Sequence, residues 1–547
     1  MVASAFPPFN LFFFSFIGIA ILIHLISDSK GYKQLFLRTF TYAIFLQLVA
    51  LSWIALSGLG KNADIFLFIG GLVLLPIHAL FLIIPSFVYY FISGNIKIKR
   101  YVYLNLFFFP FIWVAFEYFH AIGELSFPWL TLGNAFTTRL DKIQYIDITG
   151  VYGVSFWVCV LAALIYYLYS ILKVKHTDNK IKITSKKAII IYAVIIIVYI
   201  LPNIYSYVNN CERNFSNNIK NKKLKVGIIQ PNIDPWAKWS AKLYEITNDY
   251  ALQIREIGKT NSELDLIIMP ETITPYYFLE LYNDDLYRII KNSVDSLNIP
   301  VFMGIPDFVR YGDSTIAPID AKKYKSGERY DVFNSSVLLE PGKEKTIQQK
   351  YSKIRLVAGS ERMPHQDKLV FLKDLVKWGV GISSYQIGRD STIFNLGAKA
   401  KFNCGICYES IYPDFISSFV DKGSEFIVII TNDGWWGKLP GTYQHSQYSV
   451  LRAIENRRWL VRSANTGVSG IIDPYGNYIT ETQVNERKSF IGEIGLSGEK
   501  TFYTKYGDVF AQSCYFFSIF LIVLSLGKKL VGKLFRKEFD IDNKKSG

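Results

Sequence analysis

The sequence predicts a polytopic α-helical membrane domain joined to a separate α/β sandwich. Long apolar runs gather at the two ends of the 547-residue chain, whereas its middle alternates short β-rich runs with amphipathic helical patterns. Hydrophobic residues make up 50% of the chain and charged residues only 19%, below the roughly 25% of an average soluble domain. This composition excludes a disordered chain and argues against a purely soluble fold.

Seven apolar runs define the membrane part, and most can span about 30 Å of hydrocarbon as helices. The first run has no basic segment before it, and no small-residue cleavage site follows it, so we interpret it as a retained span instead of a signal peptide. The runs lie near residues 11–27, 39–57, 65–92, 103–122, 151–172, 188–208 and 509–526.

The basic residues predict the topology. The formal net charge is +15, and connections with many Lys and Arg alternate with connections that have few. Loops rich in basic residues stay in the cytoplasm. The four rich connections, near 30–38, 97–100, 173–187 and after 526, hold nineteen basic residues. Topology therefore accounts for most of the charge, and we expect no nucleic-acid partner.

These patterns divide the chain into five segments. Residues 1–208 are expected to form an N-terminal membrane domain of about six helices, followed by a linker at 209–222. Residues 223–506 form an α/β domain outside the cytoplasm, 507–527 a C-terminal membrane helix and 528–547 a basic cytoplasmic tail.

The α/β domain is predicted from strands that alternate with helices. The expected strands are Leu224–Gln230, Leu264–Met269, Val301–Ile305, Phe333–Leu339, Lys401–Ile406, Phe426–Thr431 and Ser469–Asp473. The expected helices are 238–258, 280–297, 410–421 and 443–457.

Several common catalytic sites are excluded by their missing motifs, since the chain has no HExxH, no GxxxxGK[ST] and no GxSxG. Its five cysteines are an odd number, and two lie in apolar runs, which excludes a disulfide scaffold. Cys404 and Cys407 have the CxxC spacing of zinc and redox sites. A zinc site would need a second pair of cysteine ligands, which the sequence does not offer. A redox motif should open a helix, whereas Cys404 is predicted to lie inside a strand.

Cys407 is the strongest candidate nucleophile. It follows the strand Lys401–Ile406 and precedes a helical segment. Such an elbow exposes the thiol and directs free backbone N–H groups toward the atom that it attacks. The alternative is a buried structural cysteine, which is the usual role of a lone cysteine.

Two more residues suit acyl-transfer chemistry. Glu271 ends an apolar strand, where partial burial favours a carboxylate that acts as a general base. Lys353 carries an ammonium group that can stabilise the oxyanion of a tetrahedral intermediate. The alternatives are a solvated loop glutamate and a surface lysine in a lysine-rich stretch.

Three motifs in this order resemble the nitrilase superfamily: Pro270-Glu271-Thr272, Lys353 with Glu361 eight positions later, and Gly405-Ile406-Cys407-Tyr408-Glu409. With membrane spans on both sides, nearly the whole chain resembles the apolipoprotein N-acyltransferase family. Further motifs typical of that family are Phe6–Phe9, Pro128-Trp129, Gln230–Asn232, Lys238-Trp239, Thr431–Gly437, Arg462–Gly467 and Tyr503–Asp508.

The resemblance implies a nitrilase-like αββα sandwich that transfers an acyl chain in two steps, without a cofactor or metal. Cys407 would take the chain from a phospholipid, mainly phosphatidylethanolamine, as a thioester. The α-amino group of an S-diacylglyceryl cysteine at a lipoprotein N-terminus would then accept it. In this family pattern Glu271 is the base and Lys353 supports the oxyanion, aided by the backbone of Tyr408.

The resemblance also assigns the residues around the triad and the location of the protein. Glu361 and Glu409 orient the lysine and the nucleophile, Trp239 belongs to a lid, and Phe371 lies in an apolar stretch, 369–380, expected to flank the site. The protein is expected to be a monomer in the bacterial inner membrane, with its catalytic domain on the periplasmic side.

The chain departs from the family pattern at two places. The family reads Leu-Val-Pro-Phe-Gly-Glu after its lysine, whereas this chain has Ala358-Gly359-Ser360 between Val357 and Glu361. The family also has one more membrane span than the seven predicted here. A membrane-anchored amidase that hydrolyses a small carbon–nitrogen substrate with the same three residues remains the alternative, as does an inactive scaffold with this fold.

Overall fold

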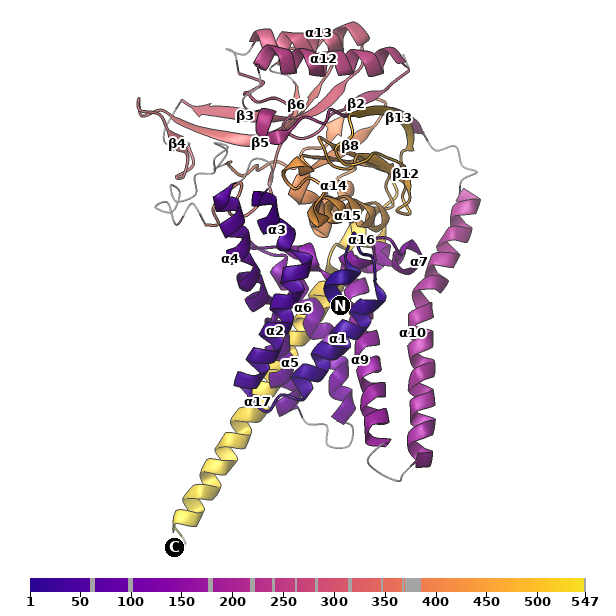
Figure 1. Ribbon diagram of the computed structural model, residues 1–547, viewed down its shortest axis with the longest axis vertical. Helices are drawn as coiled ribbons and strands as arrows, with labels where there is room; N and C mark the ends of the chain where they lie inside the picture. Colours follow the sequence, from indigo (N-terminus) through magenta and orange to yellow (C-terminus); the bar gives the residue numbers. More distant parts are fainter. Residues whose placement is uncertain are drawn as a thin grey trace.

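The computed structural model places an α/β sandwich on one end of a bundle of apolar helices (Figure 1). We describe the parts of the chain whose placement is defined. These are residues 1–59, 64–96, 102–175, 181–216, 222–238, 242–260, 263–280, 284–312, 317–345, 348–365, 368 and 385–545.

The helical bundle contains four described helices that are long and apolar enough to cross a membrane, at 67–95, 151–173, 186–208 and 509–531. A bent pair, Tyr32–Ala50 with Ser52–Leu59, forms a fifth candidate span. The predicted runs at 11–27 and 103–122 contain shorter helices, of 15 and 13 residues. The bundle helices are α1 (Phe13–Ser27), α2 (Tyr32–Ala50), α3 (Ser52–Leu56), α4 (Ile65–Leu82), α5 (Ile84–Asn95), α6 (Phe108–His120), α9 (Val151–Lys175), α10 (Ile181–Ser216) and α17 (Val509–Lys545).

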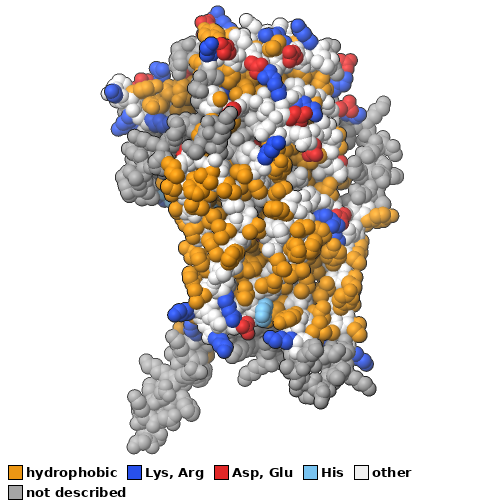
Figure 2. Space-filling view, viewed as in Figure 1, with side chains coloured by type: hydrophobic (Ala, Val, Ile, Leu, Met, Phe, Trp, Pro, Cys, Tyr) orange, Lys and Arg blue, Asp and Glu red, His pale blue; other side chains and the backbone are white. Residues whose placement is uncertain are grey.

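The surface of this bundle is apolar. Figure 2 shows hydrophobic side chains covering the helices, whereas charged side chains gather on the sandwich and at the opposite end of the bundle. Large residues of α10 point outward, with Ile189 67% and Tyr207 72% exposed. Apolar patches of this extent are rare on soluble monomers, so the chain is a membrane protein.

The sandwich consists of two sheets covered by helices on their outer faces. One sheet has the order β13-β1-β2-β3-β5-β4, with β6 paired to β5, and the other has the order β12-β11-β10-β9-β8-β7. Helices α12 (Leu243–Thr260) and α13 (Asp284–Leu297) lie over the first sheet, and α14 (Pro413–Asp421) and α15 (Pro440–Asn456) lie between the second sheet and the bundle (Figure 1). This is the αββα arrangement that the resemblance implies.

Every strand and helix expected in the α/β domain is present; β8 and β9 have the expected bounds, and the others have shifted ends. The strands are β1 (Lys223–Gln230), β2 (Leu266–Ile268), β3 (Val301–Tyr311), β4 (Lys322–Lys323), β5 (Arg329–Leu339), β6 (Gln349–Ser352), β7 (Phe394–Asn395), β8 (Lys401–Ile406), β9 (Phe426–Thr431), β10 (Leu460–Ala464), β11 (Gly470–Ile472), β12 (Tyr478–Glu481) and β13 (Lys488–Gly495). The expected strands did not include β4, β6, β7, β10, β12 or β13. Of these, β13 pairs antiparallel with β1 along eight residues and has few buried positions. The expected linker also differs, because residues 209–216 continue helix α10.

The bundle and the sandwich share one apolar core. The ring of Trp129, in the segment η4 (Pro128–Leu130), is 1% exposed, and its Nε1–H donates to Gln444 of α15 at 2.6 Å. The hydroxyl of Tyr448 donates to the Trp129 carbonyl at 2.9 Å. The close approach of Trp53 to Gly441, where a Cβ atom would meet the ring at 2.5 Å, leaves room only for glycine.

Candidate active site

The three candidate catalytic residues lie just beyond strands of the two facing sheets. Glu271 follows β2, Lys353 follows β6, and Cys407 follows β8 directly. Strands β1, β2 and β3 pair in parallel, and so do β8, β9 and β10. The carboxyl ends of parallel strands meet at one edge of a sheet, which is where ligand sites form in such folds.

Lys353 connects two carboxylates inside the protein. Its side chain is 1% exposed, and its Nζ lies 2.8 Å from Oε1 of Glu361 and 3.6 Å from Oε1 of Glu271. Asn334 joins them, because its Nδ2 donates to Glu271 at 2.7 Å and to Glu361 at 3.1 Å. The sequence predicted the two glutamates and the lysine, but it gave no signal for Asn334 on β5.

The loop between Lys353 and Glu361 still brings these two side chains together in spite of its unusual sequence. Oε2 of Glu361 accepts from the N–H of Val357 at 2.8 Å, and the N–H of Glu361 donates back to the Val357 carbonyl at 3.0 Å. Gly359 has a φ of 82°, a conformation that glycine adopts at little cost. This closed turn brings Glu361 to the lysine without the Pro-Phe pair of the family pattern.

Glu271 is held by backbone and side chains on all sides. Its Oε2 accepts from the N–H of Asn432 at 2.9 Å, beyond strand β9. A Cβ atom at Gly304 would lie 2.6 Å from the Glu271 Cα, so only glycine at this position lets strand β3 pass so close to Glu271. The buried Lys238 donates to the carbonyl of Thr272, and burial lowers the pKa of this lysine to about 8.

The charges at the site set the protonation of its groups. Burial alone would lower the pKa of Lys353, but the carboxylates of Glu361 and Glu271 outweigh it and raise that pKa. Lys353 is therefore an ammonium ion. Burial, together with the Glu271 carboxylate, raises the pKa of the Cys407 thiol, although Lys353 partly offsets this. The thiol is thus neutral near pH 7 and needs a base before it can attack.

Cys407 occupies the elbow that the sequence predicted. Strand β8 ends at Ile406, and the short 3-10 helix η9 (Cys407–Ile411) begins at the cysteine, whose φ of 51° lies in the left-handed region. A residue other than glycine adopts this conformation only where the surroundings enforce it. Part of that enforcement comes from Glu409, whose Oε2 accepts from the Ile406 N–H at 2.8 Å.

Glu409 also ties the elbow to the lysine loop. Its Oε1 accepts from the N–H of Ile354 at 2.7 Å, from the N–H of Arg355 at 3.0 Å and from the hydroxyl of Tyr351 at 2.6 Å. Burial raises the pKa of this carboxyl group, whereas the hydrogen bonds from Tyr351 and the backbone lower it. Glu409 thereby fixes the positions of Lys353 and Cys407 relative to each other.

Tyr408 connects the nucleophile to the bundle. Its hydroxyl donates to the Ser126 carbonyl at 3.0 Å, and its ring stacks on Phe127 with centroids 6.3 Å apart. Phe127 also lines a small cavity among the helices. The cavity is lined by Gln47, His78, Phe81, Leu82, Trp113, Phe116, Glu117, His120, Phe127, Pro128, Leu130 and Thr131.

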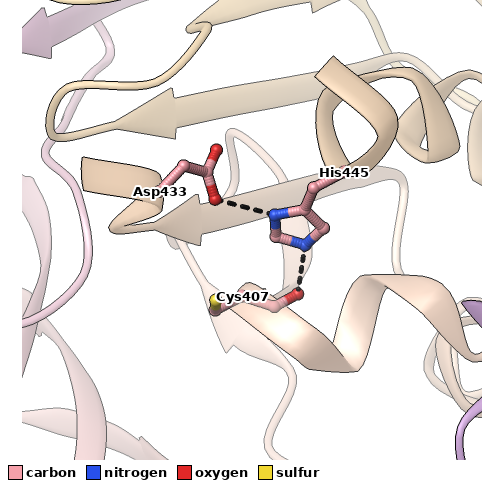
Figure 3. Close-up of side chains that lie close together, drawn as sticks. All are labelled: Cys407, Asp433 and His445. Carbon is pink, nitrogen blue, oxygen red and sulfur yellow. Dashed lines mark hydrogen bonds and ion pairs between the residues drawn. The ribbon is translucent and has the colours of Figure 1, made fainter. Parts of the chain in front are cut away.

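A second cluster, which the sequence did not predict, lies beside Cys407. Asp433, His445 and Cys407 each place one potential metal-ligand atom within 4.8 Å of the others (Figure 3). This resembles a Cys-His-Asp triad or a metal site. However, His445 contacts the main-chain oxygen of Cys407, at 3.1 Å from Nε2, and the sulfur points away from the ring (Figure 3). Both ring nitrogens already have partners within the protein, Nδ1 at 2.8 Å from Asp433 and Nε2 at 3.1 Å from the Cys407 carbonyl.

The structure describes only some of the remaining predicted site residues. Trp239, Phe371 and the apolar stretch 369–380 lie outside the described residues. Cys404 is fully buried within β8, and burial raises the pKa of its thiol well above the usual value. Cys404 and Cys407 are both free thiols.

Comparison with known proteins gives matches along nearly the whole chain. Residues 1–164 match the family model of the apolipoprotein N-acyltransferase N-terminal domain, and residues 225–501 match the carbon-nitrogen hydrolase model. An apolipoprotein N-acyltransferase of Chlorobaculum tepidum is 30% identical over 515 residues, which cover 93% of this chain and 91% of that protein. A protein of the same name from Geobacter metallireducens is 30% identical and covers 74% of this chain and 71% of its own length.

Proposed function

The chain belongs to the apolipoprotein N-acyltransferase family, and we propose that Glu271, Lys353 and Cys407 carry out its reaction by a ping-pong mechanism. The protein is an acyltransferase of this type that acts in lipoprotein maturation. The observation that carries the proposed mechanism is the buried cluster in which Lys353 lies against two carboxylates beside the Cys407 elbow.

The first step forms a thioester. Glu271 accepts the proton of the Cys407 thiol while the sulfur attacks the ester carbonyl of a phospholipid, of which phosphatidylethanolamine is the proposed main donor. The ammonium group of Lys353 and the N–H of Tyr408 stabilise the oxyanion. The carbon–oxygen bond then breaks, and the lysophospholipid leaves with the proton from Glu271.

The second step forms the amide. The α-amino group of an S-diacylglyceryl cysteine at a lipoprotein N-terminus attacks the thioester carbonyl, and Glu271 takes a proton from the amine. The carbon–sulfur bond breaks, and Cys407 regains its proton from Glu271. Both steps use the same base and the same oxyanion site, so the lysophospholipid has to leave before the amine enters.

An apolar lining near the nucleophile supports a lipid donor. The small cavity among the helices has mostly apolar walls, and Phe127 links it to Tyr408 next to the nucleophile. A small amide substrate needs no such apolar surface. The proposed location is the bacterial inner membrane, as a monomer whose sandwich lies on the periplasmic side, because Lys and Arg side chains gather at the end of the described bundle opposite the sandwich (Figure 2).

The covalent intermediate tests this proposal. Purified protein given labelled phosphatidylethanolamine without an acceptor should retain label that neutral hydroxylamine removes. Addition of a diacylglyceryl-cysteine peptide should move the label to the peptide. The Cys407→Ala variant should retain no label, whereas Cys404→Ala, a matched control three positions away, should label like the parent protein.

Two results would contradict the proposal. Active protein without hydroxylamine-labile label would exclude the thioester, and label that depends on Cys404 would assign the nucleophile to the other cysteine. Release of ammonia from small amides, with no transfer from phospholipid, would instead identify the membrane-anchored amidase.

A further inference from the structure

The cluster beside the nucleophile has contacts that the proposed mechanism does not use. Asp433 lies in the 3-10 helix η10 (Asp433–Trp435), beyond β9, and His445 lies on α15. Both side chains are fully buried. Arg462 of β10 completes the cluster, because its guanidinium donates to Oδ2 of Asp433 at 2.8 Å and lies 3.1 Å from Nδ1 of His445.

Polar partners surround both ring nitrogens of His445. Nδ1 lies 2.8 Å from the Asp433 carboxylate. Nε2 lies 3.1 Å from the carbonyl oxygen of Cys407 and 3.0 Å from the hydroxyl of Ser410. That hydroxyl donates to the same carbonyl at 2.8 Å. These contacts hold the Nε2 edge of the ring against the main chain of the nucleophile.

The ring itself is fixed by packing. Trp129 stacks on it with centroids 5.7 Å apart and an interplanar angle of 29°, and Trp436 packs edge-on at 5.7 Å. The polar groups that face it come from three elements: the Asp433 carboxylate from η10, the Arg462 guanidinium from β10 and the Cys407 carbonyl from η9. His445 cannot rotate to reach the thiol without losing these contacts.

Thr431 ties the thiol to the same cluster. Its hydroxyl donates to Oδ1 of Asp433 at 2.8 Å, the oxygen that also faces His445. Thr431 also forms a hydrogen bond with the Cys407 side chain. The cluster thus contacts both the main-chain oxygen and the sulfur of the nucleophile.

We propose that His445 is a positioning residue that holds the carbonyl of Cys407, and so keeps the nucleophile in its left-handed conformation with the sulfur directed toward the Glu271 side of the site. It acts through the main chain and accepts no proton from the thiol. The acylation test of this inference rests on the proposed function, whereas the alkylation test does not.

The test compares three variants in thioester formation from labelled phosphatidylethanolamine. His445→Leu removes both ring nitrogens and should lower the acylation rate constant about 100-fold, the loss that a displacement of about 1 Å produces. His445→Gln keeps one donor for the carbonyl and should recover about tenfold of that loss. Ser446→Ala, a buried neighbour on α15 whose hydroxyl bonds within its own helix at 3.0 Å, should stay within about twofold.

Further readouts separate positioning from other roles. The KM for phospholipid should stay unchanged in His445→Gln, because the ring contacts no substrate. The pH profile of Cys407 alkylation by iodoacetamide, measured without lipid, should shift to lower rates in His445→Gln and not in Ser446→Ala, because a weaker carbonyl contact lets the thiol move away from the base Glu271. A protein that forms no thioester at all would defeat the proposed function, and alkylation would then decide the role of His445 alone.

Three results would overturn the inference. Parental acylation and alkylation in His445→Leu would show that the contact is dispensable. A Glu271→Gln variant that still acylates, together with a His445→Gln variant that does not, would make His445 the base. If His445→Leu fails to fold and His445→Gln has parental acylation and an unshifted alkylation profile, the residue serves only the core.

Discussion

At the residue scale, the site depends on how burial and neighbouring charges oppose each other. Lys353 stays charged because two carboxylates outweigh the cost of its burial. Cys407 stays neutral because burial and Glu271 outweigh the lysine. The same cluster thus holds an ammonium ion and a neutral thiol, as the roles proposed for Lys353 and Cys407 in acyl transfer require.

The base function of Glu271 gives the first prediction. In Glu271→Gln the amide cannot accept the thiol proton, and thioester formation should fall by about 100-fold or more. The measurement is hydroxylamine-labile label from phospholipid at equal protein amounts. Glu263→Gln, the same substitution at an exposed carboxylate that pairs with Lys225, should form the thioester at the parental rate. Parental rates in both variants would remove Glu271 from the mechanism.

The raised pKa of Cys407 gives the second prediction. Below the pKa of a thiol, the thiolate fraction rises about tenfold with each pH unit. Because burial raises this pKa, alkylation of Cys407 should be slow at pH 7 and keep rising through pH 9 without a plateau. Mass spectrometry of the labelled peptide measures the rate, with Cys407→Ala as the blank. A plateau near neutral pH would show a lowered pKa instead.

At the element scale, the site depends on where strands end and what ties those ends together. The ends of β6 and β8 belong to different sheets, and no pairing between the described strands of the two sheets connects them. Glu409 makes the connection, since it accepts from two backbone N–H groups just beyond β6 and from the N–H of the last residue of β8. One carboxylate thereby sets the distance between oxyanion support and nucleophile.

The bridging carboxylate gives the third prediction. In Glu409→Gln one oxygen becomes an NH₂ group that faces N–H donors, so the variant should lose about 1–3 kcal/mol of stability and most of its acylation rate. Thermal unfolding and thioester formation are the measurements. Glu425→Gln is the matched control, because Glu425 accepts from the N–H of Lys401 at 2.7 Å at the other, exposed end of β8. Equal effects in the two variants would contradict the bridging role.

At the scale of the whole molecule, the sandwich and the helical bundle form one unit. The core cluster around Trp129 includes residues of α3, η4 and α15. The end of the sandwich that carries the nucleophile is joined to the bundle through Tyr408 and Ser126. The proposed acyl-transfer site thus lies close to the junction of the sandwich and the bundle.

Orientation in the membrane gives the fourth prediction. If the basic C-terminal segment stays in the cytoplasm, an impermeant thiol reagent added to intact spheroplasts should label Lys323→Cys on the sandwich and should not label Lys528→Cys. Both cysteines are introduced into a background in which Cys211 and Cys407 are Ser. Permeabilised cells are the control, in which both positions should react. The reverse pattern in intact spheroplasts would invert the topology.

The sequence by itself determined the elements and the chemical groups of this protein. Periodicity and apolar runs are local properties, so β1, β8, β9 and the long membrane helices could be predicted from them. Glu271, Lys353, Glu361, Cys407 and Glu409 could be named because short motifs carry them, and the structure brings all five together. The predicted roles of these residues stay predictions.

Only the tertiary structure decided which other groups surround these five site residues. Asn334 bridges two glutamates from the neighbouring strand β5, and His445 reaches the elbow from α15, 38 positions along the chain. Strand β13 was missed because it lies at the edge of its sheet, where few of its positions are buried and no clear alternation appears in the sequence. Contacts of this kind depend on which strands pair and which helix covers them, and a local pattern does not encode that choice.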